Sequence, residues 1–134
     1  MEITISAVIK LDIERVWQLW NDPKHIVNWN SASEDWHTTK ATNDLMKDGK
    51  FNYRMEAKDQ SFGFDFSGTY TKIIENELIE ILLDDNRKVK VSFSKDTGET
   101  KIVQTFEAEN KNEAELQRTG WQSILNNFKK YCEK

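Results

Sequence analysis

Histidine is the side chain that most often ligates zinc or acts as a general base. His25 and His37 are the only histidines. A zinc site needs three or four ligands, and a working histidine usually has a carboxylate that orients its ring. No third ligand stands at a suitable spacing, and neither histidine has a carboxylate neighbour on its own face. We expect both to be solvated surface residues, and the sequence predicts no metal site and no cofactor.

The other reactive groups stand at positions typical of packing. Asp65 lies between Phe64 and Phe66, so the alternation of a strand points it outward, toward a cross-strand partner such as Arg54. Cys132 stands in the last turn of a predicted helix, whereas a reactive thiol prefers a positive environment at a helix N-terminus. Nucleotide-binding, metalloprotease and serine-hydrolase motifs are absent. The sequence therefore predicts no catalytic residue.

The C-terminal stretch Glu115–Lys134 has the periodicity of one long helix with a wide apolar arc. Two of its members are unexpected on packing grounds. Gly120 costs about 1 kcal/mol relative to alanine inside a helix, and Gln117 places an amide near the centre of the arc. A helix that closes a cavity can use both. We therefore predict that Gln117 faces a cavity and that Gly120 lies where the helix passes closest to a strand or a ligand. The arc contains Gly120, Tyr131, Ile124, Gln117, Phe128, Trp121, Cys132 and Leu125.

Length and composition are typical of one soluble domain, predicted to span residues 1–134. The net charge of -4 argues against nucleic acid or an anionic membrane as the partner, because both bind basic surfaces. No run approaches the roughly 20 apolar residues of a membrane span, and the N-terminus has no signal-peptide pattern. The single cysteine excludes an internal disulfide. We expect a cytoplasmic protein.

Two kinds of periodicity divide the chain. The first ten residues alternate as a half-buried strand. Asp12 can cap a short helix over Ile13–Trp20, and Asp22 can cap a second over Pro23–Trp29. The period then changes to two, and short turns separate the strands, which favours antiparallel neighbours. This order, closed by the long helix, predicts an α+β fold. The later strands are predicted at Glu34–Ala41, Lys50–Lys58, Ser61–Ile74, Leu78–Leu83, Lys88–Ser94 and Thr100–Glu109.

One face of the predicted sheet is strongly aromatic. Side chains at alternate positions of a strand share a face, which places apolar residues opposite charged ones such as Arg54 and Asp65. The apolar arc of the terminal helix matches this face, so we expect the helix and the sheet to pack together. The shared face contains Phe51, Tyr53, Met55 and Ala57, then Phe62, Phe64, Phe66 and Tyr70, and later Val89, Val91, Phe93, Ile102 and Phe106.

The order of these features is similar to that of a known family. The N-terminal part of the match contains Val16-Trp17 with Trp20, Asp22-Pro23 with Ile26, Trp29-Asn30, and Trp36. The remainder contains Asn43-Asp44, Phe51–Met55, Gly63–Tyr70, Gly120–Leu125 and Phe128–Tyr131. With these residues the chain resembles the START-like (SRPBCC, helix-grip) superfamily, in its AHSA-type branch. That branch is named after the C-terminal domain of an activator of a heat-shock chaperone ATPase. Asp48-Gly49 stands where the family often has two glycines, which is compatible with the same turn.

The resemblance spans essentially the whole chain and has specific structural implications. It implies a curved antiparallel sheet of about seven strands wrapped around the C-terminal helix, with a cavity between them. The superfamily includes lipid and hormone binders, polyketide cyclases and chaperone cofactors. A shared fold therefore implies much less about chemistry.

The aromatic face allows two interpretations. Its side chains could fill the core completely, or they could line a cavity, since binding sites are mostly apolar clefts with a few polar groups. We favour the cavity and a hydrophobic or amphipathic ligand that is bound without reaction. Trp29 and Trp36 would form an aromatic rim, while Gln117 and tyrosine hydroxyls would orient the ligand. The predicted ligand-binding residues are Trp29, Trp36, Phe51, Tyr53, Met55, Phe64, Phe66, Tyr70, Phe106, Gln117, Gly120, Trp121, Ile124 and Phe128. The hydroxyls are those of Tyr53, Tyr70 and Tyr131.

Two other functions are compatible with the sequence. The family name suggests a chaperone-interaction module linked to the stress response, although the eukaryotic activator pairs this domain with another. A cyclase-like or hydrolase-like enzyme would use the same cavity and needs an inward ionisable group. Alternation supplies tyrosines but no clear inward carboxylate. We expect a monomer or a weak dimer, because an exposed edge at Trp29 and Trp36 suits a ligand or a second copy.

Overall fold

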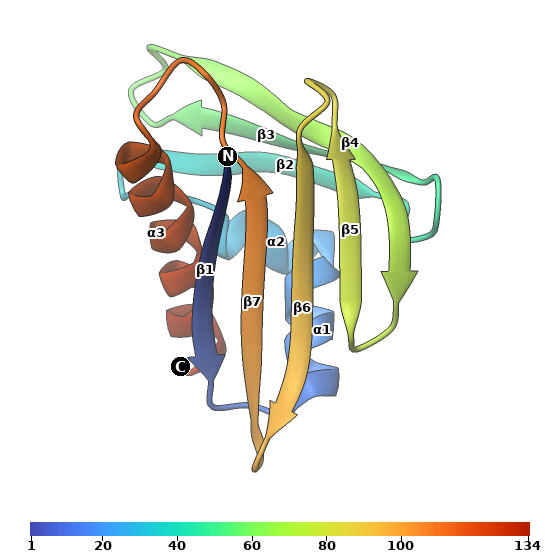
Figure 1. Cartoon of the computed structure of the whole chain (residues 1–134). Coiled ribbons are helices and arrows are strands. Elements are labelled where there is room, and N and C mark those ends of the chain that lie inside the picture. The colour runs from blue at the N-terminus through green and yellow to red at the C-terminus, as the bar shows by residue number, and fades with distance from the viewer.

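A computed structural model describes residues 1–134 as a curved seven-stranded sheet that wraps around a long C-terminal helix (Figure 1). The strand order is β1-β7-β6-β5-β4-β3-β2, and every neighbouring pair is antiparallel. The predicted α+β helix-grip architecture is confirmed. The elements are β1 (Glu2–Ile9), α1 (Ile13–Asn21), α2 (Pro23–Trp29), β2 (Trp36–Asn43), β3 (Lys50–Ala57), β4 (Gly63–Ile74), β5 (Leu78–Leu83), β6 (Lys88–Asp96), β7 (Glu99–Glu107) and α3 (Ala114–Cys132).

The two short helices begin where their capping residues predict. Asp12 accepts a hydrogen bond from the backbone N–H of Arg15 at 2.9 Å, and Asp22 accepts one from Lys24 at 3.0 Å. Each cap satisfies a backbone donor that has no partner within its helix. Pro23 is the first residue of α2, where its missing N–H removes no helical hydrogen bond. The chain therefore turns sharply between α1 and α2.

Most strand boundaries differ from the prediction by one or two residues. The largest shift is in β2, which was expected over Glu34–Ala41 and extends instead to Asn43. Asn43 pairs with Phe51 in the sheet and donates from its side chain to the carbonyl of Asn21 at 2.7 Å. Asparagine has a low strand propensity, so a tertiary contact and not local preference decides this boundary.

The C-terminal part of α3, residues 125–132, is densely packed, and we call it the packed half. The ring of Phe128 is fully buried and lies 4.9 Å from Trp20 and 4.7 Å from Trp29, both edge-on. Such pairs contribute about 0.5–1.5 kcal/mol beyond their buried area. Leu125 and Cys132 are buried beside it. Here α1 and α2 close the space between the helix and the sheet.

Polar side chains of α3 hydrogen-bond the outer edge of β1. Arg118 donates to the carbonyl of Thr4 at 2.9 Å, and Gln122 donates to that of Ser6 at 3.2 Å. Farther along the helix, Lys129 donates to the carbonyl of Val8 at 2.5 Å. Alternate carbonyls of the edge strand thus have partners on the helix, which runs beside β1 (Figure 1).

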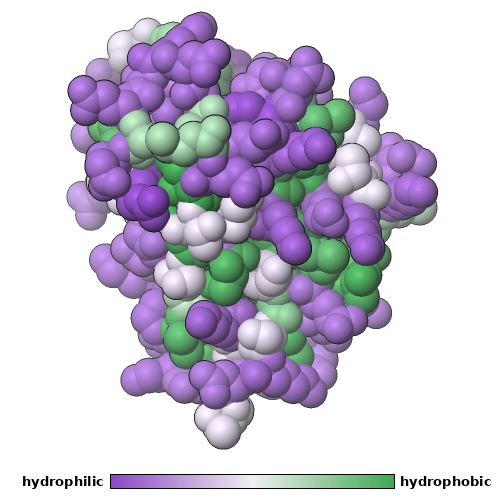
Figure 2. Space-filling model, in the orientation of Figure 1, coloured by the Kyte–Doolittle hydropathy of each residue, from purple (hydrophilic) through white to green (hydrophobic).

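The outer face of the sheet is largely hydrophilic. Figure 2 shows charged and polar side chains around a mixed region over the central strands. Asp65 and Arg54 are paired in register across β3 and β4, and their side chains lie 3.5 Å apart. The predicted outward position of Asp65 is confirmed. The aromatic side chains of β3 and β4 are therefore left on the opposite face, toward α3.

Candidate ligand-binding cavity

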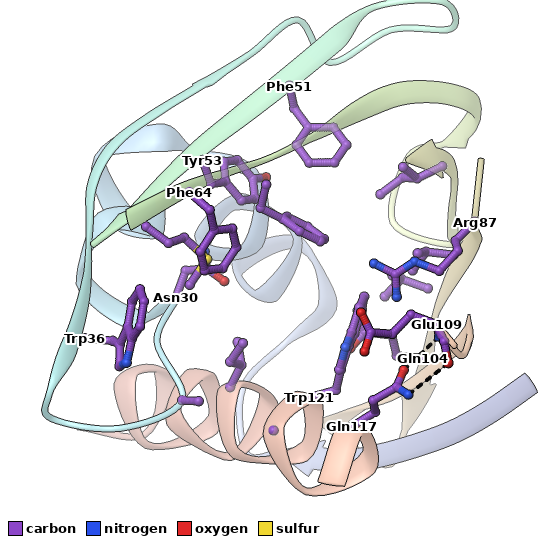
Figure 3. Close-up of a pocket in the computed structure, with 18 of the residues that line it drawn as sticks. Asn30, Trp36, Phe51, Tyr53, Phe64, Arg87, Gln104, Glu109, Gln117 and Trp121 are labelled. Carbon is purple, nitrogen blue, oxygen red and sulfur yellow. Dashed lines mark hydrogen bonds between the residues drawn. The ribbon is translucent and has the colours of Figure 1, made fainter. Parts of the chain in front are cut away.

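A cavity of about 430 Å³ lies between the sheet and the N-terminal half of α3 (Figure 3). Of its 21 lining residues, 14 are hydrophobic. Its volume falls within the 300–1,000 Å³ or so that is usual for small-molecule sites. Open space therefore lies between the inner face of the sheet and the N-terminal half of α3, and no residue of the packed half lines this cavity.

Aromatic rings of β3 and β4 form one wall of this cavity. Phe51 and Tyr53 lie 5.1 Å apart between ring centroids, and Tyr53 and Phe66 lie 6.3 Å apart. On the helix side, Trp121 stacks on Phe106 at 4.0 Å with an interplanar angle of 9°. This stack fixes the plane of the Trp121 indole against β7, so the wall is rigid as well as apolar.

Eleven of the fourteen residues predicted to bind a ligand line the cavity, and three do not. Tyr70, Phe106 and Phe128 are at most 2% exposed and belong to the core behind the wall. Each lies on the predicted inward face, but a neighbouring ring covers it. The eleven are Trp29, Trp36, Phe51, Tyr53, Met55, Phe64, Phe66, Gln117, Gly120, Trp121 and Ile124. That they bind a ligand stays a prediction.

Gly120 leaves empty space where we expected a close approach to a strand. A Cβ atom added at this position would meet no atom within 4 Å outside the helix's own backbone. Of the two predicted alternatives, a close approach to a strand is therefore wrong, and a close approach to a ligand stays a prediction. Because Gly120 lines the cavity, the missing side chain enlarges the space available to a ligand.

Gln117 lines the cavity, but its amide is already bound to the protein. Its Oε1 accepts from the backbone N–H of Glu109 at 2.9 Å. Its Nε2 donates to the carbonyl of Asn112 at 2.8 Å and to that of Glu109 at 3.2 Å. No side chain caps the N-terminus of α3 at Glu113, so Gln117 anchors the loop that enters the helix. The predicted position of Gln117 at the cavity is shown, and a role in orienting a ligand stays a prediction that the second acceptor position of Oε1 would have to fulfil.

The three tyrosines occupy different environments. Burial, with Tyr70 close by, raises the pKa of Tyr53 well above its usual value, and burial also raises the pKa of Tyr70. Both phenols therefore stay protonated at neutral pH. The hydroxyl of Tyr131 lies 2.7 Å from Nδ1 of His25, away from the cavity. Tyr131 is not a cavity residue, and His25 is partly buried rather than the solvated residue we expected.

Trp29 and Trp36 differ in a way that the sequence did not indicate. Trp29 is 3% exposed and donates its indole N–H to the carbonyl of Leu19 at 3.0 Å, so it forms the floor of the cavity. Trp36 belongs to the opening. Its ring lies 6.0 Å from Phe62 and 5.8 Å from Phe64. Those two phenylalanines are 63% and 39% exposed, and they form the aromatic rim together with Trp36.

A group of polar side chains, of which the sequence predicted only Gln117, lies at the end of the cavity opposite Trp36 (Figure 3). Glu109 was assigned to a strand, but β7 ends at Glu107, so alternation does not fix its direction. In the structure its carboxylate lines the cavity. The expectation of no inward carboxylate was therefore wrong. The polar group contains Arg87, Gln104, Glu109, Asn112 and Gln117.

The inward position of Gln104 could have been predicted from the sequence. It stands between Ile102 and Phe106 in β7, and alternation places all three on the inward face. Its residue is 9% exposed. No protein group hydrogen-bonds the amide of Gln104. Every fully buried side-chain nitrogen or oxygen in the protein has a hydrogen-bond partner, so the amide atoms of Gln104 are not fully buried and are accessible from the cavity. A ligand that covered this amide without hydrogen-bonding it would lose about 1–3 kcal/mol of binding free energy.

Arg87 and Glu109 are held by neighbouring protein groups. The Nε of Arg87 donates to Asp85 at 2.8 Å, and its Nη1 donates to the carbonyl of Glu107 at 3.4 Å. One carboxylate oxygen of Glu109 accepts from the side chain of Asn112. Each charged group keeps part of its hydrogen-bonding capacity, and Figure 3 shows both side chains directed into the cavity.

Cys132 is buried, as expected. Burial raises the pKa of its thiol to about 12, and the carboxylate of Glu133 adds to the effect. None of the three helices combines the length and the apolar character that crossing a membrane requires.

Comparison with known proteins gives one family. Residues 10–133 match the model of Activator of Hsp90 ATPase homolog 1-like proteins. The AHSA1-like protein from Aeromonas hydrophila is 47% identical, with a TM-score of 0.93 over 99% of this chain and 92% of that one. A protein from Cytophaga hutchinsonii is 45% identical, with a TM-score of 0.87 over 98% and 92%.

More distant structures share the fold alone. A protein from Chromobacterium violaceum has a TM-score of 0.85 at 18% identity, over 100% of this chain and 99% of that one. No protein with a curated description matches the sequence. The family model nevertheless covers almost the whole chain, from the end of β1 to the end of α3. The chain belongs to the family of Activator of Hsp90 ATPase homolog 1-like proteins.

Proposed function

We propose that this protein binds one hydrophobic or amphipathic small molecule in the cavity between the sheet and α3, without chemical reaction. The observation that carries the proposal is the cavity of about 430 Å³ with its mostly apolar lining. Transfer of apolar surface from water to such a wall is worth about 25 cal/mol per Å² before the costs of ordering the ligand. The gap in the helix face at Gly120 also supports it.

The opening at the aromatic rim gives the ligand a route. Phe64 lines the cavity and is also 39% exposed, which places it between the interior and solvent. On the opposite side, α3 is tied to β1 by Arg118, Gln122 and Lys129. Entry past Phe64 leaves these hydrogen bonds intact, so binding needs no separation of the helix from the sheet.

A cavity-filling variant tests the proposal. Gly120→Leu places a side chain in open space, so the variant should fold and lose ligand binding. Thr119→Leu is the matched control, because Thr119 is exposed on the same helix and does not line the cavity. The measurement is mass spectrometry of the small molecules that co-purify with each protein. Equal ligand content in the wild type and in a folded Gly120→Leu protein would reject the proposal.

An enzymatic use of the same cavity is the second candidate, and Glu109 favours it. Acid–base catalysis needs at least one inward ionisable group, and Glu109 supplies a carboxylate. In this case the co-purified molecule would change when incubated with fresh protein. Glu109→Gln would stop that change while leaving binding in place. An unchanged ligand after long incubation would exclude turnover of that compound.

The family's description makes contact with an Hsp90-type chaperone a further candidate partner. Such a contact would use the outside of the protein, and Gly120→Leu should leave it intact. A pull-down of the cytosolic chaperone with wild type and with this variant separates the two functions. Equal recovery supports a surface contact, whereas no recovery with either protein rejects it.

A further inference from the structure

The unpaired amide of Gln104 is the starting point. Its residue is 91% buried on the inward face of β7, beside Ile102 and Phe106, which are at most 1% exposed. No protein group hydrogen-bonds this amide, and its polar atoms reach the cavity. A carboxamide supplies both a donor and an acceptor. A ligand that displaces water from this amide must offer the complementary pair, or the amide loses its hydrogen bonds.

The charges around Gln104 restrict that occupant further. Arg87 is the one cation of the polar group, and its guanidinium is paired with the exposed carboxylate of Asp85 at 2.8 Å, while Glu109 adds a second carboxylate to the cavity lining. These three residues together have a formal charge of about −1. An anionic head would meet this excess negative charge, and an ammonium head would meet the guanidinium of Arg87. An uncharged polar head avoids both penalties.

The remaining walls accept a flat apolar body. Tyr53, Phe66 and Trp121 line the cavity, and Trp121 lies edge-on to Phe66 at 5.9 Å. Ring walls of this kind favour planar, ring-bearing molecules. A cavity of about 430 Å³ has room for two or three fused or linked rings.

Building on the proposed binding function, we propose that the cavity selects a ring-bearing apolar molecule with one uncharged head that both donates and accepts hydrogen bonds. The head lies against Gln104, between Arg87 and Glu109, and the apolar body extends toward Trp36. Carboxamides, phenols and alcohols belong to this class. Carboxylates, phosphates and ammonium compounds do not.

Three matched probes test the inference: 2-naphthamide, 2-naphthoate and 2-methylnaphthalene, each titrated at pH 7 against the tryptophan fluorescence of the protein. Wild type should bind the amide at least about tenfold more tightly than the carboxylate, which corresponds to about 1.4 kcal/mol. Gln104→Leu should weaken binding of the amide by about the same factor and leave methylnaphthalene binding unchanged or stronger.

Control variants separate the head site from general effects. Gln122→Leu makes the same chemical change on the outside of α3, where Gln122 does not line the cavity, and it should leave all three affinities unchanged. Gln104→Met also removes the amide and replaces the leucine variant if that protein fails to fold. Thermal unfolding verifies that each variant is native before titration.

The possible results distinguish the two proposals. Equal binding of amide and carboxylate by wild type, or no loss of amide affinity in a folded Gln104 variant, overturns the head site. In either case, binding of methylnaphthalene would leave the proposed binding function standing. Failure of all three probes to bind at their solubility limits would count against both.

Discussion

Two halves of α3 face the same curved sheet and differ in what lies between. In the packed half, residues 125–132, Phe128 is fully buried between Trp20 and Trp29. In residues 117–124, which we call the hollow half, Gln117, Gly120, Trp121 and Ile124 line a cavity of about 430 Å³. Side chains from α1 and α2 fill the space under one half only. The position of α1 and α2, more than the number of aromatic residues, decides which part of the interior is closely packed.

The strongest test of this comparison is a pair of substitutions that shorten a side chain to alanine, one in each half of α3. Phe128→Ala should destabilise the fold by about 3–5 kcal/mol, because it leaves a void in a closed core. Ile124→Ala should cost only about 1 kcal/mol, because its side chain faces space that is already open. Urea unfolding measures both. Similar losses at the two positions would show that the halves are equally packed.

The rate at which a cysteine reacts with iodoacetamide can be compared between the packed half and the hollow half of α3. Cys132 should react with iodoacetamide at pH 8 about a thousandfold more slowly than the unfolded chain, because its pKa is raised from 9.0 to about 12 and the thiolate is the reactive form. The rate should rise about tenfold per pH unit up to that pKa. A cysteine at position 124, in a Cys132→Ala background, should react much faster. Equal rates would contradict the comparison.

Loss of the Gln117 amide tests the entrance to the hollow half. Gln117→Leu removes three hydrogen bonds to the loop that precedes α3. We expect a loss of about 2 kcal/mol and faster amide hydrogen exchange in residues 109–113. Thr119→Leu, at an exposed position of α3 without a side-chain hydrogen bond, should cost less than about 0.5 kcal/mol. An unchanged stability of Gln117→Leu would mean that the loop does not depend on this amide.

The smallest effect is expected at Gly120. Gly120→Ala should raise the stability by about 1 kcal/mol, because alanine favours the helix and its methyl group meets only the cavity. The contrasting control is Gly49→Ala, since a Cβ there would lie 2.0 Å from the carbonyl oxygen of Asp44 and must destabilise the fold. A loss of stability at Gly120 would indicate that the space is not open.

The fold could be predicted because several local signals agreed. Alternation along β3, the caps at Asp12 and Asp22, and the aromatic arc of α3 all indicate the same architecture. Turns were equally clear, since Asp48, Asn76 and Asn86 adopt positive φ, a conformation that asparagine and aspartate tolerate. Each of these signals depends on neighbouring residues only.

The polar end of the cavity could be predicted only in part. Gln104 interrupts an apolar face, and its alternation with Ile102 and Phe106 would have revealed it. Arg87 and Glu109 lie outside regular strands, where no periodicity gives the direction of a side chain. Gln117 was found by its unusual position, but its partners come from a loop whose path the sequence does not specify. The periodicity of a strand or helix shows which polar side chains point inward, but it does not identify the groups to which they hydrogen-bond.

The hydrogen bonds from α3 to β1 have a consequence for association between copies of the chain. A seven-stranded open sheet has two edges, and each free edge is a template on which another strand can add. At β1 the side chains of Arg118, Gln122 and Lys129 already occupy the carbonyls that an incoming strand would need. At β2 the pairing register with β3 shifts between Thr38 and Lys40, which makes that edge irregular. Both routes to edge-to-edge aggregation are thereby obstructed, one by a helix and one by a bulge.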